Sequence, residues 1–233
     1  MRVVTETLDE QGNVTATSTT DRRTVLRATG ATYAELGVRV TVEVAGKRFD
    51  AEPRNVVEGY CGQDPDEQAD IGAPKAAKVT IEKRTVPCQV QQIEVRGAGT
   101  KQVTNIYFSD ELQPSVLKRE SVTTSTESGE KLSESVTEVL ALAMPFRVLT
   151  ELQQTAQLRT VHEHANGKVV KLWVTSPDVP GGEVAAWTKE LDAEGNVVSR
   201  STLELLDYGL KSRELRTGLF GRRRGGRVYE SAQ

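Results

Sequence analysis

Apolar and polar residues alternate along most of the chain, which is the pattern of half-buried β-strands. Val38, Val40, Val42 and Val44 are separated by polar residues, and Ala45-Gly46 then turns the chain into another short run. Successive strand side chains point to opposite faces, so such a run has one apolar and one polar face. Similar runs cover residues 79–82, 86–95, 103–108, 131–140, 158–164, 169–174 and 197–206. The pattern predicts a mainly β (α+β) protein, a long twisted antiparallel sheet or half-barrel.

Two stretches of the chain align without a gap at an offset of 66 residues. The identical positions are Val103, Pro114, Gly129, Ser133, Ser135, Glu138 and Leu140, which correspond to Val169, Pro180, Gly195, Ser199, Ser201, Glu204 and Leu206. Proline lacks a backbone donor and glycine accepts positive φ, so each stretch predicts a strand, a proline-bearing loop, a strand, a glycine turn and a third strand. We therefore expect a repeated three-strand module.

A third, clipped copy of the module opens the chain, because residues 5–14 match residues 188–197 at six of ten positions. It has no counterpart of the first strand, so we expect the natural protein to begin before Met1. The predicted divisions are 1–36 for the clipped module, 37–142 for a β module with an acidic loop, 143–209 for a helix with the second complete module, and 210–233 for a basic flexible tail.

One segment departs from the strand pattern. Between residues 145 and 157, Val148, Leu149, Leu152 and Ala156 recur at helical spacing, and proline at position 145 suits the first turn of a helix. We expect a single helix here, lying between the two complete modules.

The charge is divided between an acidic body and a basic tail. Residues 209–233 carry seven basic and two acidic side chains, a net +5, which leaves −8 for residues 1–208. The near balance over the whole chain argues against a specific nucleic-acid binder. The tail residues Arg222, Arg223, Arg224 and Arg227 are candidates for contact with an anionic surface, or they form a solubilising end. No apolar stretch approaches the length of a transmembrane helix.

Cys61 and Cys88 are the two cysteines. A disulfide between them would stabilise the chain by roughly 3 kcal/mol and would place it in an oxidising compartment. We expect this disulfide, with two buried thiols as the alternative. With that disulfide the expected location is extracytoplasmic, periplasmic or secreted. A secreted protein needs a signal segment, which is missing from this chain, so a cytoplasmic location is the alternative.

Two groups of residues are weak candidates for metal binding. His162 and His164 lie two apart and so share one strand face, and Asp64 and Asp66 belong to an acidic loop. No third ligand accompanies the histidines and the loop lacks a full calcium motif, so a solvated strand and a solvated loop are favoured. No metal and no cofactor is expected.

Tyr107 and Trp173 occupy the same module position, opposite the apolar face that carries Ile106 or Leu172 and that we expect to be buried. An aromatic side chain on a wet sheet face can stack on a sugar or an acyl chain, but packing against a neighbouring module is the more frequent role. Both readings stay open, with packing favoured.

The sequence contains no glycine-rich phosphate loop, no Gly-x-Ser-x-Gly elbow and no HExxH motif. Carboxylate pairs that meet only in space leave no such signature, so a hydrolase with unrecognised carboxylates is a third hypothesis. We expect no enzyme.

Several segments resemble modules of uncharacterised secreted β-rich bacterial proteins. They are Thr85–Val90, Tyr107–Asp110, Leu172–Val174, Asp178–Gly182 and Leu205–Gly209, and the resemblance covers most of residues 79–209. It implies an extracytoplasmic location and no activity. In architecture alone, long antiparallel strands with one helix are similar to the half-barrel of lipoprotein-localisation carriers, although no carrier motif is present.

Two hypotheses of different class follow. The first is a non-catalytic binding or scaffold protein of the bacterial envelope. The alternative is a lipid or lipoprotein carrier that holds an acyl chain between the curved sheet and the helix. The ligand is open between lipid, an envelope polymer and another protein.

Overall fold

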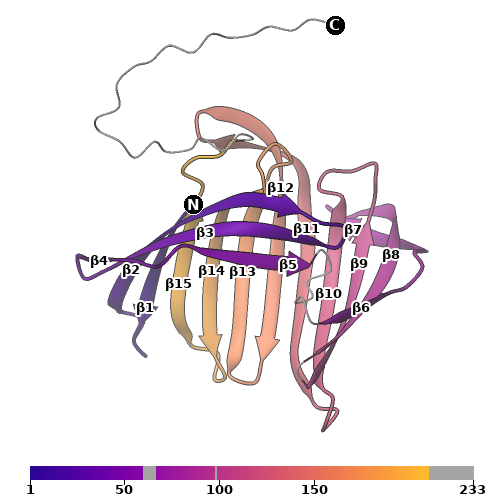
Figure 1. Cartoon of the computed structure of the whole chain (residues 1–233), viewed down its shortest axis with the longest axis horizontal. Coiled ribbons are helices and arrows are strands. Elements are labelled where there is room, and N and C mark those ends of the chain that lie inside the picture. Colours follow the sequence, from indigo (N-terminus) through magenta and orange to yellow (C-terminus); the bar gives the residue numbers. More distant parts are fainter. Residues whose placement is uncertain (60–66, 98, 210–233) are drawn as a thin grey trace, which may run out of the picture.

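The computed structural model describes residues 1–59, 67–97 and 99–209, and within these ranges every regular element is a β-strand (Figure 1). The strands are β1 Arg2–Leu8, β2 Val14–Thr29, β3 Tyr33–Val44, β4 Lys47–Asp50, β5 Arg54–Gly59, β6 Gln68–Ile71, β7 Lys75–Ile81, β8 Arg84–Gly97, β9 Thr100–Phe108, β10 Val116–Ser125, β11 Lys131–Val148, β12 Glu151–His164, β13 Gly167–Thr175, β14 Glu183–Asp192 and β15 Val197–Glu204. They form one 15-stranded antiparallel sheet, which confirms the predicted fold class.

Most neighbours in the sheet are also neighbours in the sequence, with one long-range pairing. The order is β4-β3-β2-β1-β15-β14-β13-β12-β11-β10-β9-β8-β6; β5 also pairs with β3, and β7 with β8. The first strand therefore lies beside the last, with Val3 opposite Leu203 and an ion pair between Glu6 and Arg200. β15 occupies the side of β1 where a preceding strand of the clipped module would pair.

The same turn closes the hairpins β1–β2 and β14–β15. The Asp9 carboxylate accepts hydrogen bonds from the backbone N–H of Asn13, at 2.7 Å, and from its side-chain amide, at 3.1 Å. Asp192 accepts the corresponding bonds from Asn196 at 2.8 and 3.1 Å. An aspartate that binds its own turn in this way favours the turn over other local conformations.

The turn between β10 and β11 is one residue longer, and this changes the faces of the preceding strands. Residues 126–130 connect β10 to β11, whereas residues 193–196 connect β14 to β15. The register shifts next to the turn correspond at an offset of 67, not 66. By strand pairing, the residue of the first module that occupies the position of Trp173 is Ile106, not Tyr107. A one-residue shift moves a strand's side chains to the other face, so the gapless alignment is wrong in these strands.

The predicted helix at 145–157 is wrong, because this segment forms the end of β11, a tight turn and the start of β12. Val148 pairs with Glu151, and Leu149 takes a positive φ of 54° in the turn. Leu152 is 75% exposed, although a helix would have buried it with Val148. Pairing with β11 on one side and β13 on the other outweighs the weak local preference. No helix in the described ranges could cross a membrane.

The sheet curls upon itself, and a first apolar core lies inside the curl. Val79 and Ile81 on β7 pack against Val139 on β11 and Leu158 on β12, which lie far from β7 along the sheet. Leu117 and Ala156 complete this buried cluster. The predicted boundaries 36/37 and 142/143 fall within β3 and β11.

A second buried cluster lies at one end of the sheet. Val148, Val174 and Val184 pack with Val179 from the β13–β14 loop and with Leu205 beyond β15. Ser176 in the same loop is fully buried; its hydroxyl donates to Gln153 Oε1 at 2.8 Å, and Gln153 Nε2 in turn donates to the Tyr208 hydroxyl at 3.1 Å.

The cores predict a sharp contrast between two leucines on adjacent strands. Leu158 is 5% exposed and Leu172 is 45% exposed. Leu158→Ala should lower the free energy of unfolding by about 2–5 kcal/mol, because it leaves a cavity in the curl. Leu172→Ala, the matched control, should change it by less than about 0.5 kcal/mol. Urea denaturation measures both, and equal losses would show that the curl is not the core.

Candidate binding face

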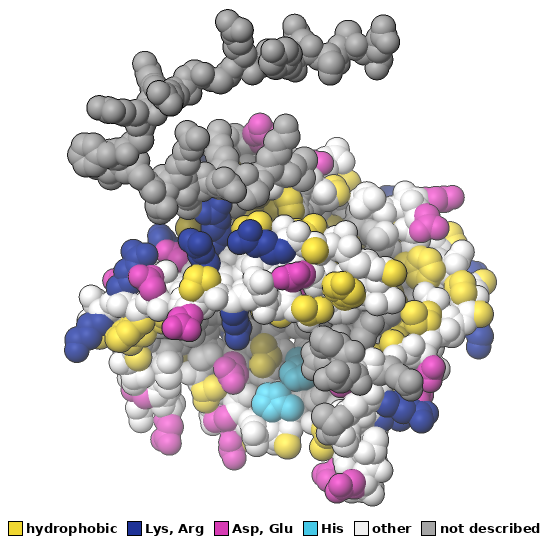
Figure 2. All heavy atoms as spheres, in the orientation of Figure 1, with side chains coloured by type: hydrophobic (Ala, Val, Ile, Leu, Met, Phe, Trp, Pro, Cys, Tyr) yellow, Lys and Arg dark blue, Asp and Glu magenta, His cyan; other side chains and the backbone are white. Residues whose placement is uncertain are grey.

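The curl gives the sheet a concave and a convex face. Figure 2 shows a recess beneath the strip that β2, β3 and β5 form in Figure 1, and the histidine side chains are visible in this hollow. Strand register identifies the residues on each face, because directly opposed residues of an antiparallel pair share a face. Trp173, Leu158 and Val139 are opposed in this way, and the concave face therefore continues the surface of the first core.

A row of hydroxyl side chains crosses the concave face next to this apolar row. It consists of Thr137, Thr160, Lys171, Thr188, Ser201, Thr5 and Ser18, each opposite the next on seven consecutive strands from β11 to β2. We call this row the hydroxyl belt. All its members are half-buried. Lys171 is the single residue in it without a hydroxyl group.

The two ends of the hydroxyl belt differ in hydrogen bonding. The Thr137 and Thr160 hydroxyls are 2.9 Å apart and bind each other. Thr5 on β1, Ser18 on β2, Thr188 on β14 and Ser201 on β15 make no side-chain hydrogen bond to the described part of the chain. Half-buried hydroxyls that face a hollow without protein partners are available to a ligand.

Trp173 stands where the apolar core meets the hydroxyl belt. Its ring packs against the first core, and its Nε1–H donates to Thr160 Oγ1 at 3.2 Å. The Lys171 ammonium lies 5.3 Å from the ring centroid and pairs with Glu183 Oε1 at 2.5 Å. The charge of Lys171 is thereby neutralised within the protein. Trp173 therefore both packs against the first core and adjoins the hydroxyl belt.

Tyr107 lies beside a different charged pair. Its hydroxyl donates to Glu120 Oε2 at 3.0 Å, and the Lys118 ammonium lies 5.5 Å from its ring. Burial and the Glu120 carboxylate raise the pKa of Tyr107, whereas the hydrogen bond from Lys118 lowers the pKa of Glu120. Tyr107 packs against the first core. Sequence reasoning equated it with Trp173, but the structure separates the two side chains.

The prediction that Leu172 is buried on the first strand of the second module is wrong. Leu172 was expected to be buried with Val174, yet Leu172 is exposed on the convex face opposite Trp187, which is itself 49% exposed. Val174 is buried, but in the second core. Because Trp173 points to the concave face, Leu172 and Val174 both point to the other face, where the second core covers Val174 and leaves Leu172 exposed.

His162 and His164 lie on the concave face with their ring centroids 5.6 Å apart. His162 is opposite Ser135 and Val169, and His164 Nδ1 accepts a hydrogen bond from the Asn166 backbone N–H at 3.2 Å. Within the described ranges no group of three or more histidine, cysteine, aspartate or glutamate residues is placed to hold a metal ion. By strand register, both histidine side chains add polar surface to the concave face.

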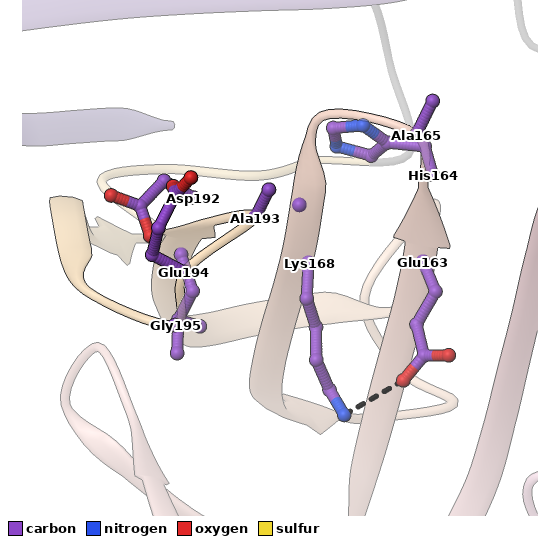
Figure 3. Close-up of a pocket in the computed structure, with 10 residues that line it drawn as sticks. Glu163, His164, Ala165, Lys168, Asp192, Ala193, Glu194 and Gly195 are labelled. Carbon is purple, nitrogen blue, oxygen red and sulfur yellow. Dashed lines mark ion pairs between the residues drawn. The ribbon is translucent and has the colours of Figure 1, made fainter.

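A pocket of about 380 Å³ lies between the β12–β13 and β14–β15 turns (Figure 3). The Lys168 ammonium lies 2.8 Å from the Glu163 carboxylate, and this ion pair is directed away from the turn. The His164 ring lies at the turn itself. Asp192 faces the pocket but is bound to its own turn. Gly167 brings the turns together, because a Cβ there would lie 2.0 Å from the carbonyl oxygen of Leu191.

Other predicted site residues have different outcomes. The predicted disulfide is not found: Cys88 on β8 is a free thiol against the first core, and burial raises its pKa. Its predicted partner Cys61 lies outside the described residues. So do the acidic-loop residues Asp64 and Asp66, and the tail residues Arg222, Arg223, Arg224 and Arg227.

Sequence reasoning missed the hydroxyl belt, although the chain carries a signal for it. Serine or threonine occupies every second position at residues 133–137, 199–201, 5–7 and 18–20. Such alternation places the hydroxyls on one face of each strand. It does not say that β15 pairs with β1, which is what joins these separate segments into one row.

We expect that one methyl group added at position 167 strongly lowers the stability of the protein, because there is no space for it. Gly167→Ala should destabilise the protein more than Gly195→Ala, although both glycines have positive φ, 143° and 89°. Positive φ costs either alanine about 1–3 kcal/mol, but a Cβ at Gly195 meets nothing within 4 Å. Thermal unfolding of both variants measures the difference. Equal losses would show that the two turns do not approach closely.

The aspartate turns predict a pH dependence. Hydrogen bonds from Asn196 hold the pKa of Asp192 below its ordinary value near 3.8. The resulting stabilisation is present above that value and is lost as pH falls through the folded-state pKa. Asp192→Asn should therefore reduce the difference in stability between neutral and strongly acidic pH. A carboxyl chemical-shift titration that gives an ordinary pKa for Asp192 would contradict this expectation.

No protein-family model matches the chain, and no curated protein matches it. Among solved structures, the chain is similar to one from Bacteroides fragilis NCTC 9343 described as a "putative exported protein with YmcC-like fold". The match has a TM-score of 0.30 and 9% sequence identity, and it covers 87% of this chain and 93% of the other. A likeness at this level carries no information on function.

Proposed function

We propose that this chain is a non-catalytic binding protein of the bacterial envelope whose concave face holds its ligand. The observation that carries the proposal is the hydroxyl belt: seven adjacent strands present half-buried polar side chains to a hollow, and four of the hydroxyls lack partners among the described residues. The envelope location rests on the sequence resemblance to secreted bacterial modules.

The charged groups of this face support binding over catalysis. Lys171 is paired with Glu183, and Glu190 accepts a hydrogen bond from the Ser199 hydroxyl at 3.1 Å. A general acid or base needs a group that is free to exchange a proton with a substrate. Lys171 and Glu190, charged groups that lie next to the hydroxyls of the belt, are instead engaged by protein partners.

The lipid-carrier alternative has less support from the structure than from the sequence pattern. It required an acyl chain between a curved sheet and a helix, but the segment expected to be that helix is β11 and β12. An acyl chain on the hydroxyl belt would cover polar groups without satisfying them, at a cost of about 1–3 kcal/mol for each fully buried hydroxyl.

A steric block tests the proposal. Thr188→Trp should fill the hollow, whereas Thr202→Trp, the matched control, adds the same ring to the exposed convex face of the adjacent strand. Three probes are offered by native mass spectrometry and equilibrium binding: soluble polysaccharides, phosphatidylglycerol vesicles and a fluorescent fatty acid. At least one should bind the natural chain and the control but bind Thr188→Trp at least tenfold more weakly.

Three results would overturn the proposal. Binding that Thr202→Trp weakens and Thr188→Trp does not would place the ligand on the convex face, and failure of all three probes to bind at millimolar concentration would leave the concave face without a ligand of the proposed kind. Release of a cleaved product, lost in Thr188→Trp, would instead show an enzyme.

A further inference from the structure

The ligand class can be narrowed from the chemistry of the hydroxyl belt, on the assumption that the proposed function holds. We propose that the concave face binds an extended glycan, with the sugar hydroxyls on the hydroxyl belt and an apolar sugar face against Trp173. Four features of the described residues support this choice: belt length, two-way hydrogen bonding, the adjoining aromatic ring and internal charge neutralisation.

The length of the hydroxyl belt favours a polymer. It spans seven strands from β11 to β2, and neighbouring strands are about 4.8 Å apart, so the belt is roughly 30 Å long. A single sugar or a small metabolite would touch a short part of such a row. An extended chain running across the strands can contact hydroxyls on one strand after another.

The hydrogen-bonding character of the hydroxyl belt favours a polyhydroxylated ligand. Each serine or threonine hydroxyl can both donate and accept, and so can each hydroxyl of a sugar. Thr5 and Thr188 have no side-chain partner within the described chain, and their hydroxyls are half-buried. A phosphate or carboxylate ligand would use their donors alone. A glycan can use both functions along the whole row.

Trp173 supplies the apolar part of the site. Sugar rings carry C–H groups on their faces, and aromatic side chains offer them a rigid apolar surface. Trp173 is held in place by its contact with the first core and by its hydrogen bond to Thr160, and the Lys171 ammonium lies over part of its ring. The ring is thus fixed beside the hydroxyl belt before a ligand arrives, which limits the entropy lost on binding.

The charges on this face are consistent with a ligand recognised mainly through hydroxyl groups. The ammonium group of Lys171, the charged member of the hydroxyl belt, is paired with Glu183. An anionic lipid or nucleic acid would be recognised by a cluster of unpaired cations. Among the described residues the belt itself has Lys171 as its one cation, and Arg119 lies beside the belt, opposite Thr137 on β10. A peptide strand would be recognised at a sheet edge through backbone hydrogen bonds, whereas the hydroxyl belt lies on a sheet face.

The test removes hydroxyl groups and preserves side-chain shape. Thr5→Val with Thr188→Val deletes two hydroxyls of the belt, and Thr19→Val with Thr202→Val deletes two from the convex face as a matched control. None of these four hydroxyls has a partner in the described chain, so both double variants should fold. Circular dichroism and thermal unfolding check this.

Binding to a panel of soluble glucans, mannans and peptidoglycan fragments is then measured by isothermal titration calorimetry. The double variant of the hydroxyl belt should bind a responsive glycan about tenfold or more weakly, because two hydrogen bonds are lost, and the control double variant should match the natural chain. Trp173→Leu should weaken the same glycan, whereas Trp187→Leu on the convex face should not.

Failure of this inference can be told apart from failure of the proposed function. If the fatty acid or the vesicles bind, Thr188→Trp blocks them and the glycans do not bind, the concave face is a binding site but the glycan inference is wrong. Glycan binding that survives removal of the belt hydroxyls would also overturn the inference. If no probe binds the natural chain, both proposals fail.

Discussion

A sheet without covering helices in the described chain must bury apolar surface against itself, and the rest of this structure depends on that constraint. With 37% apolar residues the chain has too few apolar side chains to build a second complete layer over this sheet. The solution is a curl, in which β7 returns over β11 and β12 and encloses the first core. The curl buries one end of the concave face and leaves the remainder as a hollow (Figure 2).

The pairing of β1 with β15 extends the concave face beyond the C-terminal hairpins. Backbone hydrogen bonds and the Glu6–Arg200 ion pair connect residues almost two hundred positions apart. An exposed ion pair contributes little by itself, so the backbone ladder and the contact between the half-buried Val3 and Leu203 provide most of the attachment. Without this pairing the hydroxyls of β1 and β2 would not continue the row formed by β11 to β15.

The division of the concave face into an apolar end and a hydroxyl end follows from the same geometry. Val139 on β11 and Leu158 on β12 contact β7, and this contact excludes water. Thr137 and Thr160 each lie two positions further along the same strands, where β7 does not cover them. Hydroxyls that lack protein partners would be costly under a packed layer, so this end stays open. Trp173 spans the boundary, with its ring in the core and its N–H on Thr160.

The sequence by itself determined the antiparallel β class, most strand positions and the glycine turns, because these depend on period-two patterning and local turn chemistry. Only the tertiary structure decided which strands meet. The segment 145–157 has a helical pattern of leucine and valine but forms strands, because it gains two strand neighbours. The single extra residue in the turn at 126–130 places Tyr107 on the face opposite that of Trp173, although the two side chains were expected on the same face. The serine and threonine alternation was visible in the chain, yet a row across seven strands exists only because β15 pairs with β1. Local patterns are set by neighbouring residues, whereas a binding face is set by contacts between distant ones.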